Sequence, residues 1–155
     1  MICLRGAKIE DVTEYVKTVS NTEQVCIVHV GTNNVGRYGV TDFYKEMCGK
    51  YTRLLMECSK KDRVKFIISG IVPRADFYPF MNGVDPLVFQ QIGLINSWLE
   101  GECKEWGFGF VSLHREVAWV WKLLSRDGLH LNRAGAAKLG RVFHDQVSMV
   151  QGSLN

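Results

Sequence analysis

The chain has 155 residues, 46% of them hydrophobic and 23% charged, which is the balance of a single globular domain. Nineteen basic against sixteen acidic residues leave a net charge of +3, too small to indicate a nucleic-acid-binding surface. No apolar run approaches the roughly 18 residues of a membrane span, and the first eight residues lack the pattern of a signal peptide. We therefore expect a domain that binds neither membranes nor nucleic acids.

The cysteines indicate the cellular compartment. They are odd in number, no two have Cys-x-x-Cys spacing, and three lie in apolar runs. Buried free thiols explain them better than disulfides or a zinc site. This favours an intracellular, cytoplasmic location. The five are Cys3, Cys26, Cys48, Cys58 and Cys103.

The first half of the chain predicts two strands and two helices. Residues 2–4 are a short apolar run, and residues 25–30 are β-branched and apolar enough for a strand buried on both faces. Between them, a helical spacing joins Ile9, Val12, Val16 and Val19. After a loop containing Gly31, Gly36 and Gly39, Thr41 can cap a second helix. Its predicted inward face consists of Phe43, Met47, Leu54, Leu55 and Cys58.

The second half repeats this alternation. Residues 64–69 and 108–113 predict two further strands, and Asp85-Pro86 predicts a helix start with Asp as the cap. That helix is lined by Val88, Ile92, Ile95 and Leu99. The last predicted helix begins near Asn132 and turns inward Ala136, Leu139, Phe143, Val147 and Val150. Such alternation predicts a parallel sheet with helices on both faces and a ligand site outside the carboxyl ends of the strands.

A first candidate motif is Gly31-Thr32-Asn33-Asn34, directly after the strand at residues 25–30. It is not a phosphate-binding P-loop, because the Gly-Lys-Ser/Thr ending of that loop is missing. Two interpretations stay open. One is a tight turn with Asn33 or Asn34 in a left-handed conformation. The other is an asparagine amide that donates to a developing oxyanion.

A second candidate is Asp127-Gly128-Leu129-His130-Leu131-Asn132, before the last helix. A catalytic triad needs a histidine whose second ring nitrogen is held by a carboxylate, and Asp127 and His130 can meet in this way within one turn of loop. The alternative is that Asp127 or Asn132 caps a helix and His130 is simply exposed.

The other histidines have structural interpretations. We interpret His29, inside a predicted strand, as a core or cleft-wall residue. His114 is expected on the surface, and His144 has no second ligand one helical turn away. No cluster of His, Cys and Asp has the spacing of a metal site.

Together the two motifs resemble blocks III and V of the SGNH (GDSL-type) hydrolases, a family of carboxylic-ester hydrolases. Residues 67–74 are similar to that family's next strand and Pro-containing loop, and the resemblance runs from about Ile2 to Val150. The order Cys3-Leu4-Arg5-Gly6-Ala7, a valine-rich helix and His29-Val30-Gly31-Thr32-Asn33 is most similar to the esterase-like domains of vertebrate retrotransposon-derived proteins. The resemblance implies one domain over residues 1–155 with the flavodoxin-like, three-layer α/β/α fold of the family.

Carried over by position, the resemblance implies His130 as the general base, Asp127 as the carboxylate that orients it, and Asn33 as an oxyanion-hole amide. Gly6 lies near the family's glycine that donates a backbone N–H to the oxyanion, although residues up to Asp11 could fill that role. Asn34 stands where many members have Asp. The implied substrate is a small ester and no metal or organic cofactor is implied. The acyl group and the oligomeric state stay open.

The family's nucleophile is a serine in a Gly-Asp-Ser motif after its first strand, and the sequence contains no such motif. Ser69 and Ser112 fall at predicted strand ends, but neither has the strand-turn-helix setting that presents a nucleophile. We therefore expect an N-terminally truncated domain that lacks the first strand and is inactive as it stands. The alternative is a non-catalytic scaffold or interaction domain of a retroelement-like protein. Without the first strand, residues 2–4 should be displaced or should pair directly with residues 25–30.

Overall fold

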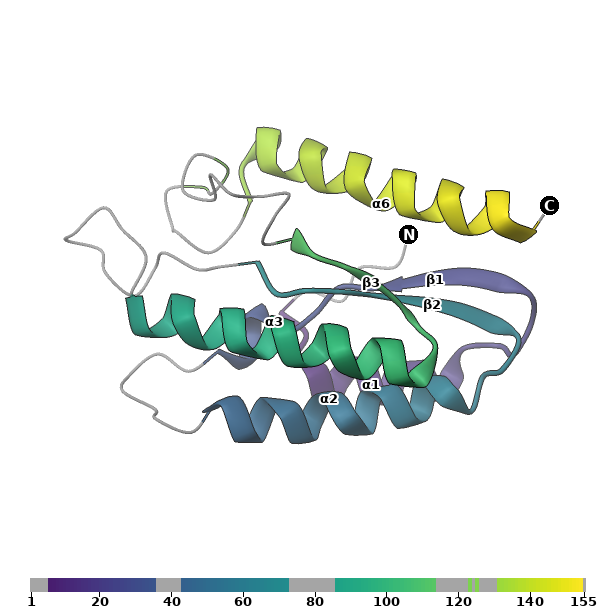
Figure 1. Ribbon diagram of the computed structural model, residues 1–155, viewed down its shortest axis with the longest axis horizontal. Helices are drawn as coiled ribbons and strands as arrows, with labels where there is room; N and C mark the ends of the chain where they lie inside the picture. The colour runs from purple at the N-terminus through teal and green to yellow at the C-terminus, as the bar shows by residue number, and fades with distance from the viewer. Residues whose placement is uncertain are drawn as a thin grey trace.

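The computed structural model describes residues 6–35, 43–72, 86–113, 123, 125 and 131–154. Its three strands form a parallel sheet in the order β1-β2-β3 (Figure 1). The elements in chain order are α1 (Ile9–Thr18), β1 (Gln24–Val28), the 3-10 turn η1 (Thr32–Asn34), α2 (Phe43–Ser59), β2 (Val64–Ser69), α3 (Pro86–Trp106), β3 (Gly109–Val111) and α6 (Arg133–Leu154).

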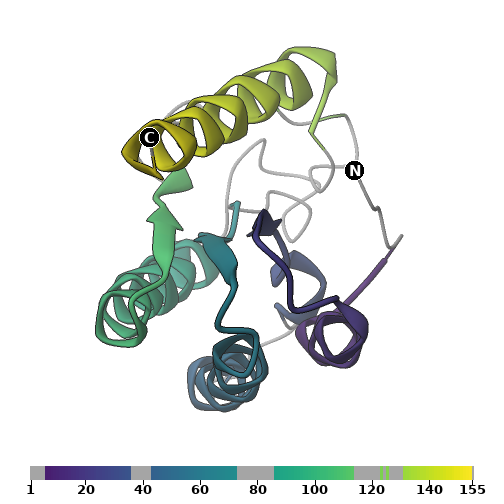
Figure 2. The ribbon, with the colours of Figure 1, turned by 90° about the vertical axis from the view of Figure 1, so that its right-hand side faces the viewer.

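Helices cover both faces of the sheet. Figure 2 shows α1, α2 and α3 on one face and α6 on the other. The first three helices and one face of the sheet share a large apolar cluster, whose fully buried members include Tyr51, Leu54 and Ile92. A smaller cluster joins α6 to the other face, around Ile67 and Val111. The predicted α/β/α architecture is confirmed.

The place of each strand in the sheet decides how deeply it is buried. β2 pairs with β1 on one side and with β3 on the other, and five of its six residues are buried. β1 pairs only with β2 among the described residues, and Val28 is its one fully buried residue. Its apolar residues Val25, Cys26 and Ile27 are only half-buried. In the part of the chain that the structure describes, the outer edge of β1 has no partner strand, and its apolar side chains are partly open on both faces.

Most predicted elements match the structure closely. The strand at residues 64–69 and the inward faces of α1, α2 and α3 are confirmed, and α3 begins at Pro86. Two predicted strands are shorter than expected, because the ladder of β1 ends at Val28 and that of β3 at Val111. Residues 2–4, Thr41 and Asp85 lie outside the described residues.

One predicted inward residue of the last helix is wrong. Ala136 is exposed, and Gly135 is buried in its place. Gly135 packs so closely on Leu123 that a Cβ there would overlap the Leu123 carbonyl oxygen. The helix also starts as predicted, because the Asn132 side-chain oxygen accepts the backbone N–H of Gly135 at 2.9 Å. Among the described helices, none combines the length and the apolar character needed to cross a membrane.

Candidate active site

The candidate site lies at the carboxyl ends of β1 and β2, where ligands bind in open parallel sheets. Three segments meet there. They are the turn after β1, the residues that precede α1, and the end of β2 with the loop that follows it.

The turn after β1 is fixed by a glycine and a buried tyrosine. Gly31 has a φ of 122°, and a Cβ at this position would overlap the Tyr51 hydroxyl. That hydroxyl donates to the Val30 carbonyl at 2.8 Å, and burial raises the pKa of Tyr51, so the phenol stays protonated. The Asn34 N–H then closes the turn on the Gly31 carbonyl at 3.0 Å. The chain is thus forced to turn sharply just before Asn33.

Asn33 lies on the exposed side of this turn and contacts the segment before α1. Its side-chain amide donates to the Ala7 carbonyl at 3.2 Å. Ala7 directly follows Gly6, which has a φ of 66°. An amide nitrogen carries two N–H groups, so this bond leaves a second one for another acceptor. The structure therefore brings together the two segments to which the resemblance assigns the oxyanion hole.

Asn34 makes two further bonds to the same segment. Its side-chain oxygen accepts the backbone N–H of Ile9 at 2.8 Å, and its side-chain nitrogen donates to a Glu10 carboxylate oxygen at 2.9 Å. Burial raises the pKa of Glu10, but hydrogen bonds from its own backbone, Asn34 and Lys50 outweigh this, and the net shift is downward. Sequence reasoning assigned no role to Asn34, because its partners lie 24 and 25 residues away.

The end of β2 carries a histidine–serine contact. His29 Nδ1 lies 2.6 Å from Ser69 Oγ, and the His29 ring packs edge-on against Phe143 of α6, with centroids 5.6 Å apart. Part of the His29 surface is exposed, yet desolvation by the surrounding protein lowers its pKa. Ser69 is completely buried. A serine enclosed in this way cannot meet a substrate as a nucleophile.

The loop after β2 is held by a residue that sequence reasoning missed. Asn96 of α3 accepts the Ile71 N–H at 2.7 Å and donates to the Ile71 carbonyl at 3.1 Å. Asn96 is 7% exposed and lies on the apolar face of α3, next to Ile92 and Leu99. A polar residue in the middle of such a stripe is the signal that could have identified it.

The predicted pair Asp127 and His130 lies outside the described residues. Their mutual contact and their distance from Asn33 stay predictions. In the described part of the chain, no three His, Cys, Asp or Glu side chains lie close enough to hold a metal ion.

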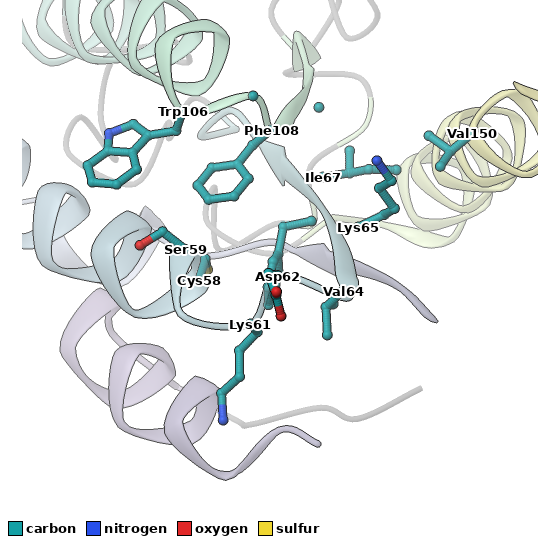
Figure 3. A pocket seen from close by; sticks show the side chains of 13 residues that line it. Cys58, Ser59, Lys61, Asp62, Val64, Lys65, Ile67, Trp106, Phe108 and Val150 are labelled. Carbon is teal, nitrogen blue, oxygen red and sulfur yellow. The ribbon is translucent and has the colours of Figure 1, made fainter. Parts of the chain in front are cut away.

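A hollow of about 410 Å³ lies at the opposite end of the sheet, by the amino ends of β2 and β3. Figure 3 shows Trp106 and Phe108 along one side of it and Val150 of α6 on the other. Two of its polar side chains bond to neighbouring segments, because Lys61 donates to the Lys17 carbonyl and Asp62 accepts from Asn21. Because it lies at the amino ends of the strands, the hollow is separate from the candidate site.

Solved structures share the fold of this chain. A gut microbial diltiazem-metabolizing enzyme matches 90% of the chain with a TM-score of 0.72 at 16% identity. A GDSL-like lipase from Bacteroides thetaiotaomicron matches 94% with a TM-score of 0.68 at 19% identity, and an acylhydrolase-like protein from Bacteroides fragilis matches 94% with 0.68 at 18%. The chain has the fold of the GDSL-like hydrolases.

These solved structures are longer than this chain. It spans 37% of the diltiazem-metabolizing enzyme, 73% of the lipase and 72% of the acylhydrolase-like protein. No family model matches the sequence, and no curated protein does.

Proposed function

We propose that the chain supplies the histidine and the oxyanion hole of an SGNH-type carboxylic-ester hydrolase. The contact between Asn33 and the segment that begins at Gly6 carries this proposal. It joins the two segments to which the family resemblance assigns the oxyanion donors, at the end of the sheet where ligands bind in this kind of fold.

In the proposed reaction, a serine oxygen attacks the ester carbonyl and His130 accepts the serine proton. Asn33 and a backbone N–H at Gly6 stabilise the oxyanion, and Asp127 orients the imidazole. Collapse of the intermediate breaks the bond to the alcohol, which leaves with the proton from His130. Water then attacks the acyl-enzyme with His130 as base, which releases the acid and restores the serine.

The serine has to be supplied by a strand that pairs with β1. The sequence has no Gly-Asp-Ser, and Ser69 is enclosed. Among the described residues nothing pairs with the outer edge of β1, whose residues Val25 and Ile27 are half-buried. A parallel strand there would cover these side chains and end beside Asn33. We propose that the chain is inactive without it.

The test compares the chain with a fusion that adds a strand ending in Gly-Asp-Ser, taken from a similar GDSL-like protein, before Met1. Hydrolysis of nitrophenyl acetate is measured. The unmodified chain should show no acyl-enzyme burst, because removing a nucleophile leaves at most roughly a thousandfold advantage over water. The fusion should gain at least about a hundredfold, and His130→Ala should abolish the gain. Strong turnover by the unmodified chain that a serine reagent blocks would overturn the proposal.

A second candidate is a non-catalytic scaffold, such as an interaction domain of a retroelement-like protein. The missing Gly-Asp-Ser motif supports it, because a scaffold needs no nucleophile. On this alternative, a folded fusion with the added serine would show no gain in hydrolysis.

A further inference from the structure

We infer that Asn34 is a positioning residue that holds the two oxyanion donors, Asn33 and Gly6, at a fixed separation. The assignment of Asn33 and Gly6 as oxyanion donors rests on the proposed function. The hydrogen-bonded tie between the turn that contains Asn33 and Asn34 and the start of α1 does not, because it can be measured without catalysis.

The tie consists of three hydrogen bonds from one short turn to three residues at the start of α1 and just before it. Asn33 donates to the Ala7 carbonyl, while Asn34 accepts from the Ile9 N–H and donates to the Glu10 carboxylate. The N–H groups in the first turn of a helix have no partner within that helix. Asn34 therefore caps α1 from a distant part of the chain, and it fixes the segment that leads back to Gly6.

Position 34 needs a group that accepts and donates at once. An asparagine amide does both, whereas an ionised aspartate only accepts. The lowered pKa of Glu10 keeps its carboxylate charged at neutral pH. An aspartate at position 34 would keep the bond from Ile9 but would place a second negative charge about 3 Å from Glu10. Lys50, 3.3 Å from the other Glu10 oxygen, can offset this only in part. The asparagine is therefore matched to Glu10.

The chain offers a matched control at the opposite end of the sheet. Asn21 accepts the Arg63 backbone N–H at 2.9 Å and donates to the Asp62 carboxylate at 2.8 Å. It has the same two kinds of partner as Asn34, but it lies far from Asn33 and Gly6. Asn21→Asp thus repeats the chemical change without touching the candidate site.

The experiment records ¹H–¹⁵N spectra and amide exchange of the full chain with Asn34→Asp, Asn34→Asp/Glu10→Gln and Asn21→Asp. Asn34→Asp should shift the Asn33 side-chain amide and the Gly6 backbone amide, and should speed exchange at Ile9 by about tenfold or more. Glu10→Gln should reverse both effects, because the amide of the introduced glutamine can donate to the introduced aspartate. Asn21→Asp should leave the Asn33 and Gly6 signals in place.

Asn33 and Gly6 signals that do not move in Asn34→Asp, or that move equally in Asn21→Asp, would overturn the inference. A missing reversal by Glu10→Gln would do the same, because the effect would then not come from the charge pair. If Glu10→Gln reverses both effects but the serine-bearing fusion shows no hydrolysis, the tie is established and the proposed function is rejected.

Discussion

Asparagine side chains hold the loops at both ends of the sheet, because an amide can satisfy a donor and an acceptor together. Asn34 and Asn96 do so beside the candidate site, and Asn21 does so at the opposite end. The exposure of these residues differs, since Asn96 is almost completely enclosed and Asn21 is exposed. The free-energy cost of losing each amide should differ accordingly.

Replacing Asn96 with leucine should lower the free energy of unfolding by about 2–5 kcal/mol, because both backbone groups of Ile71 would stay buried without partners. The same change at Asn21 should cost less than about 1.5 kcal/mol, since water can replace the lost amide. Urea denaturation of both variants measures the difference. Equal losses of unfolding free energy in the two variants would show that burial does not determine how much these hydrogen bonds stabilise the fold.

Gly31→Ala should be strongly destabilising, by about 3 kcal/mol or more, because the residue has a positive φ and its new methyl group would overlap Tyr51. Gly49→Ala is the matched control. Gly49 lies inside α2 with open space around it, so alanine there should stabilise the fold by roughly 0.5–1 kcal/mol. The midpoint temperature of thermal unfolding should fall in Gly31→Ala and rise in Gly49→Ala. A shift in the same direction in both variants would contradict this prediction.

His29 should make stability depend on pH. Desolvation lowers its pKa from the ordinary 6.5, so the unfolded chain binds this proton more readily than the folded chain. The free energy of unfolding should be highest above pH 6.5 and should fall as the pH drops below it. His29→Gln should flatten this part of the curve, measured by urea denaturation between about pH 5 and 8. His144→Gln, at an exposed position of α6, controls for the loss of an imidazole.

At the scale of elements, sequence patterns predicted what each segment buries but not how the segments meet. The spacing of Val88, Ile92, Ile95 and Leu99 predicted the inward face of α3, because helical periodicity is a local property. The tie between Asn34 and α1 could not be predicted, because it depends on a contact between residues far apart in sequence. Likewise, the apolar run at residues 25–30 predicted burial on both faces. β1 is only half-buried, because burial of a strand requires neighbours on both sides and β2 is its one partner among the described residues.

No strand among the described residues covers the outer edge of β1, so the purified chain should associate through this strand as its concentration rises. Val25→Lys places a charge at the start of that edge and should reduce the association, measured by light scattering. Met149→Lys is the control, because Met149 is an exposed apolar residue that belongs to α6 and not to β1. A larger reduction from Met149→Lys would place the association on α6 instead.

At the scale of the whole molecule, the two apolar clusters differ in how many buried residues they contain. Among the described residues, the cluster shared by α1, α2 and α3 contains twenty buried residues and the α6 side contains four. The described side chains that α6 contributes, such as Leu139 and Phe143, are only partly buried. The α6 layer should therefore open at a lower free energy than the rest. Native-state hydrogen exchange should show α6 amides exchanging before those of β2, and equal protection would contradict this order.

The order in which the two clusters occur along the chain has a consequence for its synthesis. All residues of the larger cluster precede residue 111, whereas α6 begins only at Arg133. A growing chain can therefore close one face of the sheet while Ile67 and Val111 still face water on the other. At about 5–20 residues per second, the 40 or so residues up to Val150 take several seconds to make. During that interval the nascent chain should present a bare apolar sheet face, which a ribosome-associated chaperone would recognise.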